Sequence, residues 1–249
     1  MNNNSEDIAI IFYKFFRMIP VTKPELMEQV YRLRYQVYCL ETGFENRDDF
    51  PNEQEKDDFD NRSKHFLIQH LATGSYAATT RLILSDKNNP DLPFPLEQHS
   101  QIERTDLLRP IARHQLAEVS RFCVSKDFKR RVGELGTVAG YSSEHNQSSQ
   151  EAREEERRSF PLITLGLIAS LIRMAVEYDT SYWYSTMEPT LIRLLKHMGI
   201  CFIPLGPAIE YHGKRIPCII KVQDLLDGVK ENNLQGWNLL TDYGRFAKI

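Results

Sequence analysis

The sequence predicts a mixed α/β (α+β) fold in which a mostly antiparallel sheet is flanked by helices. Two strand-like runs, residues 65–71 and 76–84, are separated only by residues 72–75, which is the length of a tight hairpin connection. A long apolar helix is predicted over residues 160–178, and a second helix over residues 188–198 precedes further strand-like segments. Strands that alternate with amphipathic or apolar helices predict a sheet covered by those helices.

Composition and charge are those of an ordinary folded protein. The chain has 249 residues, of which 41% are hydrophobic and 26% are charged, and we expect one domain over residues 1–249. Its 31 basic and 34 acidic residues give a net charge of −3. A protein whose affinity comes from neutralising phosphates carries excess positive charge, so we expect no nucleic-acid partner.

The cysteines, histidines and apolar segments indicate the class of environment. Cys39, Cys123, Cys201 and Cys218 form no C-x-x-C pair, which is typical of reduced thiols in a cytoplasmic protein. The most apolar segment, residues 162–172, is shorter than the roughly 20 residues that cross a bilayer, so we expect no stable membrane insertion. The seven histidines show no H-x-H or H-E-x-x-H spacing, and we expect no metal site.

The first helix is predicted to begin at Thr22 and to end at Gly43. Thr22 and Glu25 have the spacing of a capping box, in which each side chain accepts a hydrogen bond from the other residue's backbone N–H. Arg34 and Tyr38 lie one turn apart, at the edge of an apolar face made of Leu26, Val30, Leu33 and Val37.

An acidic loop, the hairpin, an insertion and a strand follow this helix. Residues 45–60 hold eight acidic and two basic residues and are predicted to form a loop. Residues 85–110 show no sustained periodicity and are predicted to be a long insertion. Leu116–Val124 is predicted to be a strand, in which Glu118 and Arg121 point to opposite faces unless a bulge intervenes.

The second half of the chain is predicted to alternate helices with strands. A basic turn and a polar stretch lead to the 160–178 helix. The later elements are a strand at 182–185, a helix at 188–198 closed by Gly199, and strands at 200–204 and 216–222.

The order, spacing and context of seven polar positions resemble a known family. The set resembles the signature of the acyl-homoserine-lactone autoinducer synthases, a branch of the GNAT acyltransferase fold. The resemblance implies a twisted sheet with helices on both faces and a cleft between splayed central strands. The residues that carry it are Arg34, Tyr38, Asp57-x-x-Asp60, Arg81, and Glu118-x-x-Arg121 followed by Phe122.

Three segments are more closely similar to the exosortase-associated acyltransferases of the PEP-CTERM system, which are N-acyl amino acid synthases. These segments are residues 33–38, 187–189 and 210–217, and the resemblance covers about residues 10–225. It implies transfer of an acyl chain from an acyl-phosphopantetheine thioester to an amine, with no permanently bound cofactor.

Departures from the autoinducer synthases affect the expected donor and acceptor. Phe44 stands where those enzymes have a tryptophan near their S-adenosylmethionine site, and insertions at about residues 85–115 and 132–158 lengthen the chain. The phosphate-loop pattern at residues 130–135 lacks its second small residue, so we expect acyl carrier protein rather than coenzyme A as donor. A basic turn suits the acidic surface of such a carrier, with a merely solvated turn as the alternative. Its residues are Lys126, Lys129, Arg130 and Arg131.

Glu118 and Arg121 are the candidate catalytic residues. N-acylation requires an amine without its proton, a polarised thioester carbonyl, and contact between the two. Burial on a strand raises the pKa of a carboxyl group, so Glu118 is predicted to take the proton of the amine through a water. The alternative is an ion pair between Glu118 and Arg121, Arg81 or Arg34. By resemblance, the thioester oxygen meets the backbone N–H groups of Phe122, Cys123 and Val124.

An acceptor site shaped for an amino acid is predicted from four further residues. Arg34 and Arg81 are bidentate donors suited to a carboxylate, and Asp57 and Asp60 are suited to an ammonium group. The alternative is a snorkelling arginine and a solvated acidic loop. The remaining candidate pocket residues are Tyr38, Phe44, and the turn residues Tyr211, His212 and Arg215.

The sequence therefore predicts an N-acyltransferase that moves a long acyl chain from acyl carrier protein to the amine of an amino acid or related acceptor. Two alternatives stay open, an autoinducer synthase that uses S-adenosylmethionine and a non-catalytic acyl-carrier or lipid-binding module. Release of methylthioadenosine distinguishes the first, and carrier binding without product distinguishes the second.

Overall fold

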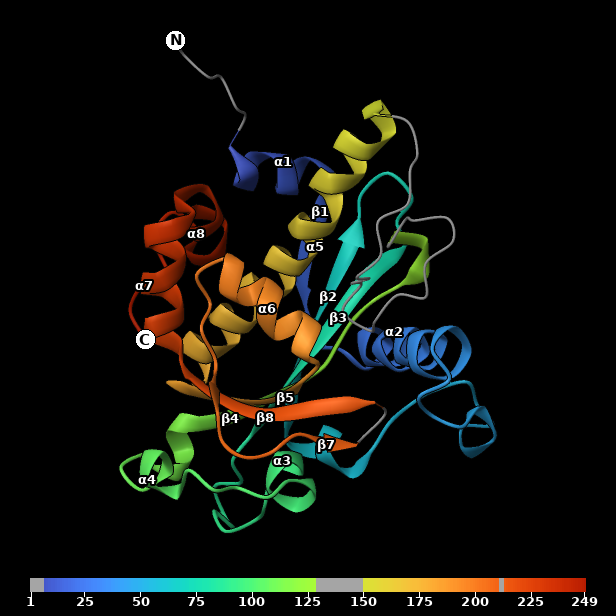
Figure 1. Cartoon of the computed structure of the whole chain (residues 1–249). Coiled ribbons are helices and arrows are strands. Elements are labelled where there is room, and N and C mark those ends of the chain that lie inside the picture. The colour runs from blue at the N-terminus through green and yellow to red at the C-terminus, as the bar shows by residue number, and fades with distance from the viewer. Residues whose placement is uncertain (1–6, 129–149, 211–212) are drawn as a thin grey trace.

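The computed structural model describes residues 7–128, 150–210 and 213–249. Within these ranges the chain forms an eight-stranded sheet in the order β1-β2-β3-β4-β5-β8-β6, with β7 paired to β8 (Figure 1). Every pairing is antiparallel except that between β4 and β5, which confirms the predicted mostly antiparallel sheet. The strands are β1 Phe16–Pro20, β2 Ser63–His70, β3 Tyr76–Leu84, β4 Leu116–Val124, β5 Tyr182–Met187, β6 Ile203–Pro204, β7 Ile209–Glu210 and β8 Lys214–Lys221.

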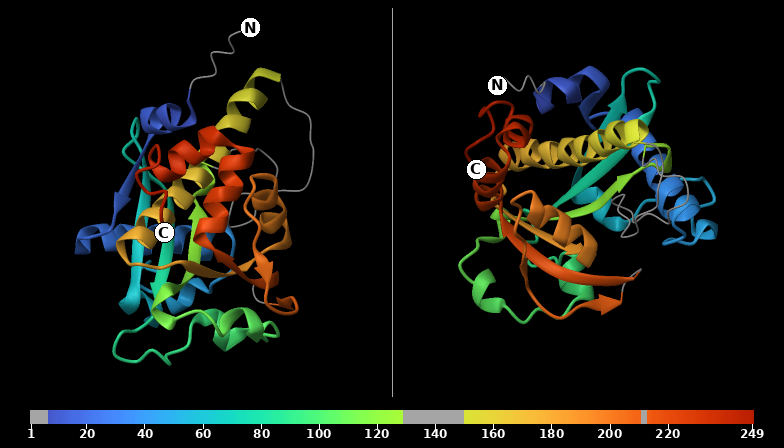
Figure 2. Two further views of the ribbon diagram at one scale, coloured as in Figure 1. Left: turned by 90° about the vertical axis from the view of Figure 1, so that its left-hand side faces the viewer. Right: turned by 45° about the horizontal axis from the view of Figure 1, so that its top comes forward.

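Helices cover both faces of the sheet (Figure 2). The helix α2 continues directly into a π-helix, Gln36–Glu41. Short 3-10 turns occupy Arg47–Asp49, Asp58–Arg62, Arg113–Gln115 and Lys126–Phe128. The α-helices are α1 Ile8–Phe15, α2 Pro24–Tyr35, α3 Pro95–His99, α4 Thr105–Leu108, α5 Gln150–Glu177, α6 Pro189–His197, α7 Val222–Asn232 and α8 Leu234–Thr241.

The main hydrophobic core lies between one face of the sheet and α5. This helix crosses strands β1 to β4, with α1 and α8 packed beside it (Figures 1 and 2). Successive strand residues alternate between the two faces of the sheet, so Phe66 and Ile68 join this core while Leu67 joins the core on the opposite face. The alternation in the sequence therefore determines which side chains remain for the opposite face.

On that opposite face, two smaller cores lie side by side. One is formed by α2 and the π-helix and includes Val30, Leu67 and Cys123. The other is formed under α3 by Phe94, Leu96 and strand residues such as Tyr184. The polar candidate site residues lie on this face, between the two apolar clusters.

Strands β4 and β5 separate soon after they pair. Their parallel ladder joins only Leu116–Glu118 to Tyr182, Trp183 and Tyr184, although β4 continues to Val124 and β5 to Met187. Beyond Tyr184, β5 stays paired with β8, while β4 stays paired with β3. The splayed central strands that the resemblance implies are therefore present.

A β-bulge in β4 changes which face its side chains occupy. Arg81 lies opposite Ser120 but Thr79 lies opposite Cys123, so β4 holds one residue more than β3 between these pairs. Arg121 occupies this bulge with a φ of 48°, a left-handed conformation that costs a non-glycine residue of order 1–3 kcal/mol. After the bulge Cys123 faces α2, while Phe122 packs toward the main core.

The structure corrects several predicted elements. The capping box at Thr22 is wrong, because α2 begins at Pro24 with Lys23 as its N-cap and no side chain caps it. The predicted strand at residues 200–204 is reduced to Ile203–Pro204. Edge strand β1 and helices α7 and α8 were not predicted, since five residues are too few to establish a period and the C-terminal segment has no strong motif.

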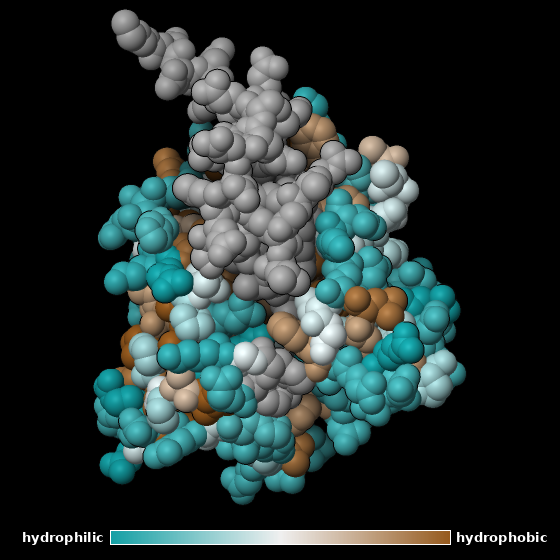
Figure 3. All heavy atoms as spheres, turned by 45° about the vertical axis from the view of Figure 1, so that its right-hand side comes forward, coloured by the Kyte–Doolittle hydropathy of each residue, from teal (hydrophilic) through white to brown (hydrophobic). Residues whose placement is uncertain are grey.

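Within the described ranges, no helix combines the length and apolar character that spanning a membrane requires. The face turned toward the viewer in Figure 3 is largely hydrophilic where it is described, with apolar side chains in small, separate groups.

Candidate active site

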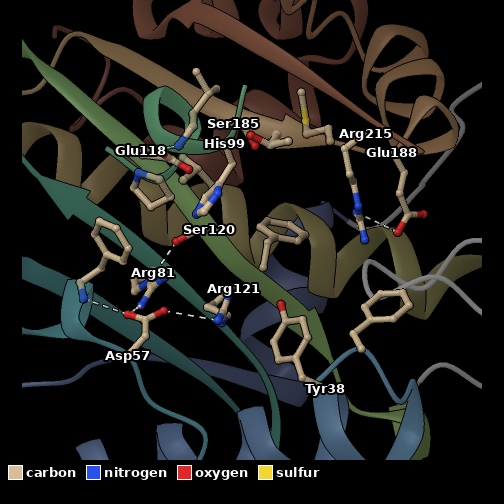
Figure 4. Close-up of a pocket in the computed structure, with 18 of the residues that line it drawn as sticks. Tyr38, Asp57, Arg81, His99, Glu118, Ser120, Arg121, Ser185, Glu188 and Arg215 are labelled. Carbon is tan, nitrogen blue, oxygen red and sulfur yellow. Dashed lines mark hydrogen bonds and ion pairs between the residues drawn. The ribbon is translucent and has the colours of Figure 1, made fainter. Parts of the chain in front are cut away.

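A pocket opens on the α2 and α3 side of the sheet, where β4 and β5 diverge (Figure 4). Its walls come from the bulged part of β4, the last residues of β5, helix α3, the π-helix and the acidic loop. The lining residues that matter for chemistry are Tyr38, Phe44, Glu45, Asp57, Arg81, His99, Glu118, Ser120, Arg121, Glu188 and Arg215.

Glu118 is a buried carboxyl group in the wall of this pocket. It is 3% exposed, and its Oε2 atom accepts a hydrogen bond from the Leu96 backbone N–H at 2.9 Å. Burial raises the pKa of Glu118 to about 8, although the Leu96 N–H and Arg81 act in the opposite direction. Among the described residues no arginine, lysine or histidine forms an ion pair with it, so the ion-pair alternative is wrong there.

Two arginines and three carboxylates form a buried network on the α2 side of the pocket. Arg34 donates from Nε to Glu55 at 2.5 Å and from Nη1 to Asp60 at 2.7 Å. Arg81 donates from Nη1 to Asp57 at 2.6 Å and to Asp60 at 2.8 Å. Since α2, the acidic loop and β3 each contribute a member, this network fixes three segments that are distant in sequence.

The bulged residue Arg121 extends the network into the pocket. Its Nη2 atom donates to Glu55 at 2.9 Å and lies 3.3 Å from Asp57 and 3.4 Å from Glu45. Its guanidinium lies 5.2 Å from the ring centroid of Tyr38, which the π-helix carries. The carboxylates therefore hold Arg121 in the strained conformation that shapes the bulge.

The network keeps its carboxylates ionised despite burial. Burial alone raises the pKa of Glu55, but Arg34 and Arg121 outweigh it and lower the pKa to about 2. Burial also raises the pKa of Asp60, but Arg34 and Arg81 outweigh it and lower the pKa below its ordinary value. Burial and the neighbouring Arg34 lower the pKa of His65 to about 3, so this histidine is neutral.

No group of three or more metal-binding side chains is arranged for an ion in the part of the chain that the structure describes.

The far side of the pocket carries a second charged pair. Arg215 of β8 lies 2.9 Å from Glu188, and its guanidinium is 5.6 Å from the ring centroid of Phe44 (Figure 4). The wall of the pocket that faces the arginine network is therefore formed by the β5–β8 half of the sheet.

Comparison with known proteins agrees with this geometry. Residues 33–139 match the family model of the acetyltransferase (GNAT) domain. Over these residues, which are less than half of the chain, the sequence is similar to that domain. No curated protein is similar enough in sequence to be matched to it.

Three solved structures share the fold of this chain at low sequence identity. The AHL synthase LasI is 18% identical with a TM-score of 0.53, over 86% of this chain and 95% of its own. The N-acyl amino acid synthase FeeM from uncultured soil microbes is 14% identical with a TM-score of 0.56, over 88% and 97%. The CoA-dependent acyl-homoserine lactone synthase BjaI, solved with MTA, is 18% identical with a TM-score of 0.53, over 93% and 89%.

The structure brings the four predicted acceptor residues together, but with contacts that differ from the expected ones. Arg34 is completely buried, does not line the pocket, and directs its donors to Glu55 and Asp60. The expectation that Arg34 grips a substrate carboxylate does not fit this geometry, because both the burial and the carboxylate partners exclude it. Arg81 and Asp57 do reach the pocket, whereas Asp60 lies behind them.

The predicted oxyanion donors on β4 divide into two kinds. Ser125 donates its backbone N–H to Ala77 of β3 at 2.8 Å. Because N–H groups alternate in direction along a strand, that of Cys123 also points to β3, and those of Phe122 and Val124 point to the open edge. The side chain of Phe122 lines the pocket, whereas the side chains of Cys123 and Val124 are buried elsewhere.

The predicted carrier-binding residues are only partly described. Lys126 is exposed, and its backbone N–H donates to Glu41 at 2.8 Å. Lys129, Arg130, Arg131, Tyr211 and His212 lie outside the described residues, as does the start of the predicted 132–158 insertion.

Five residues of the site were missed by sequence reasoning, namely Glu45, Glu55, His99, Ser120 and Glu188. Glu55 is 1% exposed and bridges Arg34 and Arg121, Ser120 accepts from Arg81 Nε at 2.9 Å, and Glu188 pairs with Arg215. Glu45 and Glu55 left a signal because both lie in the acidic loop with Asp57, and Glu188 left one because it lies in the 187–189 segment.

Acid is expected to destabilise the protein through Glu55. The pKa of this group in the folded state, about 2, is below its ordinary 4.5, so its stabilisation is present above pH 4.5 and is lost as pH falls toward 2. Denaturant unfolding across this window should show a slope of up to about 1.4 kcal/mol per pH unit from this group. Glu55→Gln should remove that slope and the exposed control Glu53→Gln should not; equal slopes in both would contradict the assignment.

Proposed function

We propose that this acyltransferase moves a long acyl chain from acyl carrier protein to the amine of an amino acid or related acceptor. The observation that carries the proposal is Glu118, a buried carboxyl group beside the open edge of β4 that forms no ion pair with any residue the structure describes. A base with a pKa near 8 is well matched to an amine, because proton transfer between groups of similar pKa is efficient near neutral pH.

Glu118 and the backbone N–H groups at the open edge of β4 have different roles in the reaction. One proton of the acceptor's ammonium group passes to Glu118 through a water, and the nitrogen then attacks the thioester carbonyl carbon. Backbone N–H groups of Phe122 and Val124 stabilise the resulting oxyanion. Collapse breaks the C–S bond, and the second proton of the nitrogen passes to the leaving sulfur, which leaves an amide and a free thiol.

The acceptor binds between the arginine network and Glu118. Asp57 and Glu45 reach the pocket and receive the ammonium group, while Arg81 and Arg121 hold these carboxylates and orient the acceptor. The likeness to FeeM, whose name states that it is an N-acyl amino acid synthase, supports this class of acceptor.

A second candidate is a lactone synthase that uses S-adenosylmethionine, which the likeness to LasI and BjaI favours. Phe44 and the chain insertions favour the amino-acid acceptor instead. A link to the PEP-CTERM system remains a prediction that rests on the resemblance of residues 33–38, 187–189 and 210–217.

Mass spectrometry of reactions with acyl carriers and acceptors tests the proposal. We expect an N-acyl amino acid from acyl carrier protein, weaker turnover with acyl-coenzyme A, and no methylthioadenosine from S-adenosylmethionine. Charge reversal at Lys129, Arg130 and Arg131 should weaken carrier binding, as should added salt. Release of methylthioadenosine would support the lactone synthase, and carrier binding without any product would contradict catalysis.

A further inference from the structure

Helix α3 closes over Glu118 and sets the environment of its carboxyl group. Leu96 donates its backbone N–H to Glu118 at 2.9 Å, and both Pro95 and Leu96 line the pocket beside it. Helix α3 belongs to the segment between β3 and β4, so Glu118 owes its burial to an irregular part of the chain.

A helix of five residues does not hold itself in place, because isolated helices this short are unstable. Arg113 supplies the anchor. It donates from Nη1 and Nη2 to the two oxygens of Glu97 at 2.5 and 2.7 Å, in a bidentate ion pair. It also donates to the carbonyl oxygens of Pro90 and Leu92 at 3.0 Å each, which fixes the chain before the helix.

The anchor is joined to β4 and to an aromatic core. Arg113 lies in the 3-10 turn that immediately precedes β4, five residues before Glu118. Its guanidinium is 4.4 Å from the ring centroid of Phe94, which Arg62 contacts at 5.1 Å and Tyr184 meets edge-on at 5.8 Å. Displacement of Arg113 therefore loosens α3 directly above the carboxyl group.

We propose that the Arg113–Glu97 pair is a positioning device that keeps α3 closed over Glu118 and thereby holds this group as a base active near neutral pH. The inference rests on the proposed function for the role of Glu118. The charged groups that act on Glu118 are Arg81 from β3, Glu97 from α3, and Arg62 from the turn before β2. Burial outweighs all of them, so opening α3 lowers the proton affinity of Glu118.

The test compares Arg113→Met with Arg113→Lys and with the control Arg104→Met. Arg104 is an exposed arginine of the same segment, and among the described residues its side chain pairs with Asp106 alone. We measure kcat/KM for the amine as a function of pH. Arg113→Met should move the acidic limb of this profile to lower pH by about one pH unit. Arg113→Lys should keep the acidic limb close to its wild-type position. Arg104→Met should leave the profile unchanged.

A second readout does not require turnover. The difference in unfolding free energy between each protein and its Glu118→Gln derivative, measured against pH, reports the proton affinity of Glu118 directly. Its midpoint should shift down in Arg113→Met by the same amount as the kinetic limb. Should Arg113→Met fail to fold, Leu96→Ala, which removes apolar cover without breaking the ion pair, is expected to give the same shift.

The outcomes separate this inference from the proposed function. An unmoved or raised midpoint in foldable Arg113→Met or Leu96→Ala would overturn the positioning role, whatever the enzyme catalyses. A shifted midpoint in a protein that shows no Glu118-dependent acyl transfer would support the positioning role and contradict the proposed function.

Discussion

Replacement of Glu118 by glutamine is expected to lower kcat about 10²- to 10⁴-fold while leaving binding of the acyl donor nearly unchanged. Glutamine keeps the size of the side chain and its acceptor oxygen for the Leu96 N–H, but it cannot take a proton. Steady-state kinetics with both substrates measure the effect, with exposed Glu103→Gln as the matched control. Wild-type turnover in Glu118→Gln would remove Glu118 from catalysis.

The same variant should change two pH dependences. The base must be deprotonated, so wild-type kcat/KM should rise with pH to a limb near the Glu118 pKa of about 8, and the variant should lose this limb. Stability changes with the opposite sign. Since the pKa in the folded state lies above its ordinary 4.5, protons favour the folded protein, and wild-type stability should fall relative to the variant between pH 4.5 and 8.

Replacement of Arg34 by methionine is expected to cost about 3–5 kcal/mol of unfolding free energy. Arg34 is completely buried and pairs with Glu55 and Asp60. Without it, each of these buried carboxylates keeps a single arginine partner among the described residues, Arg121 for Glu55 and Arg81 for Asp60. Equilibrium denaturation measures the loss. Arg32→Met, an exposed position on the same helix, should change stability by less than about 0.5 kcal/mol.

The kinetics of Arg34→Met distinguish a structural role of Arg34 from direct contact with the substrate. A buried arginine that only holds the network should affect the KM values of acceptor and carrier together, through the folded fraction and the position of Arg121. A large rise in the KM of the acceptor alone, with stability unchanged, would contradict the role that the structure gives to Arg34.

Local patterns predicted most of the framework, and long-range contacts account for what they missed. Strand-like runs separated by a short connection located β2 and β3, because a strand that is buried on both faces has few polar positions to interrupt its run. The short edge strand β1 escaped prediction because its pairing with β2 depends on residues about fifty positions away.

The geometry of the candidate site also depends on long-range contacts that local sequence patterns do not predict. The bulge that brings Glu118 and Arg121 to one pocket arises from a register shift against β3, and the carboxylates that hold it come from the acidic loop. Motif order grouped Asp57 and Asp60 with the arginines that they contact in the structure, but the burial of Arg34 follows from how α2 packs on the sheet. No local pattern separates a buried arginine from one that faces substrate.

The short ladder between β4 and β5 has a mechanical consequence. Within the described residues, the sheet's two halves share only the pairs from Leu116–Glu118 to Tyr182–Tyr184, whereas the ladder between β2 and β3 runs from Ser63 to Gln69. Small relative rotations of the halves therefore strain few backbone hydrogen bonds. Glu118 sits in the last of these pairs, so it lies near the pivot, while Arg215 and Arg121 lie on opposite arms. The pocket can thus change in width with little displacement of its base.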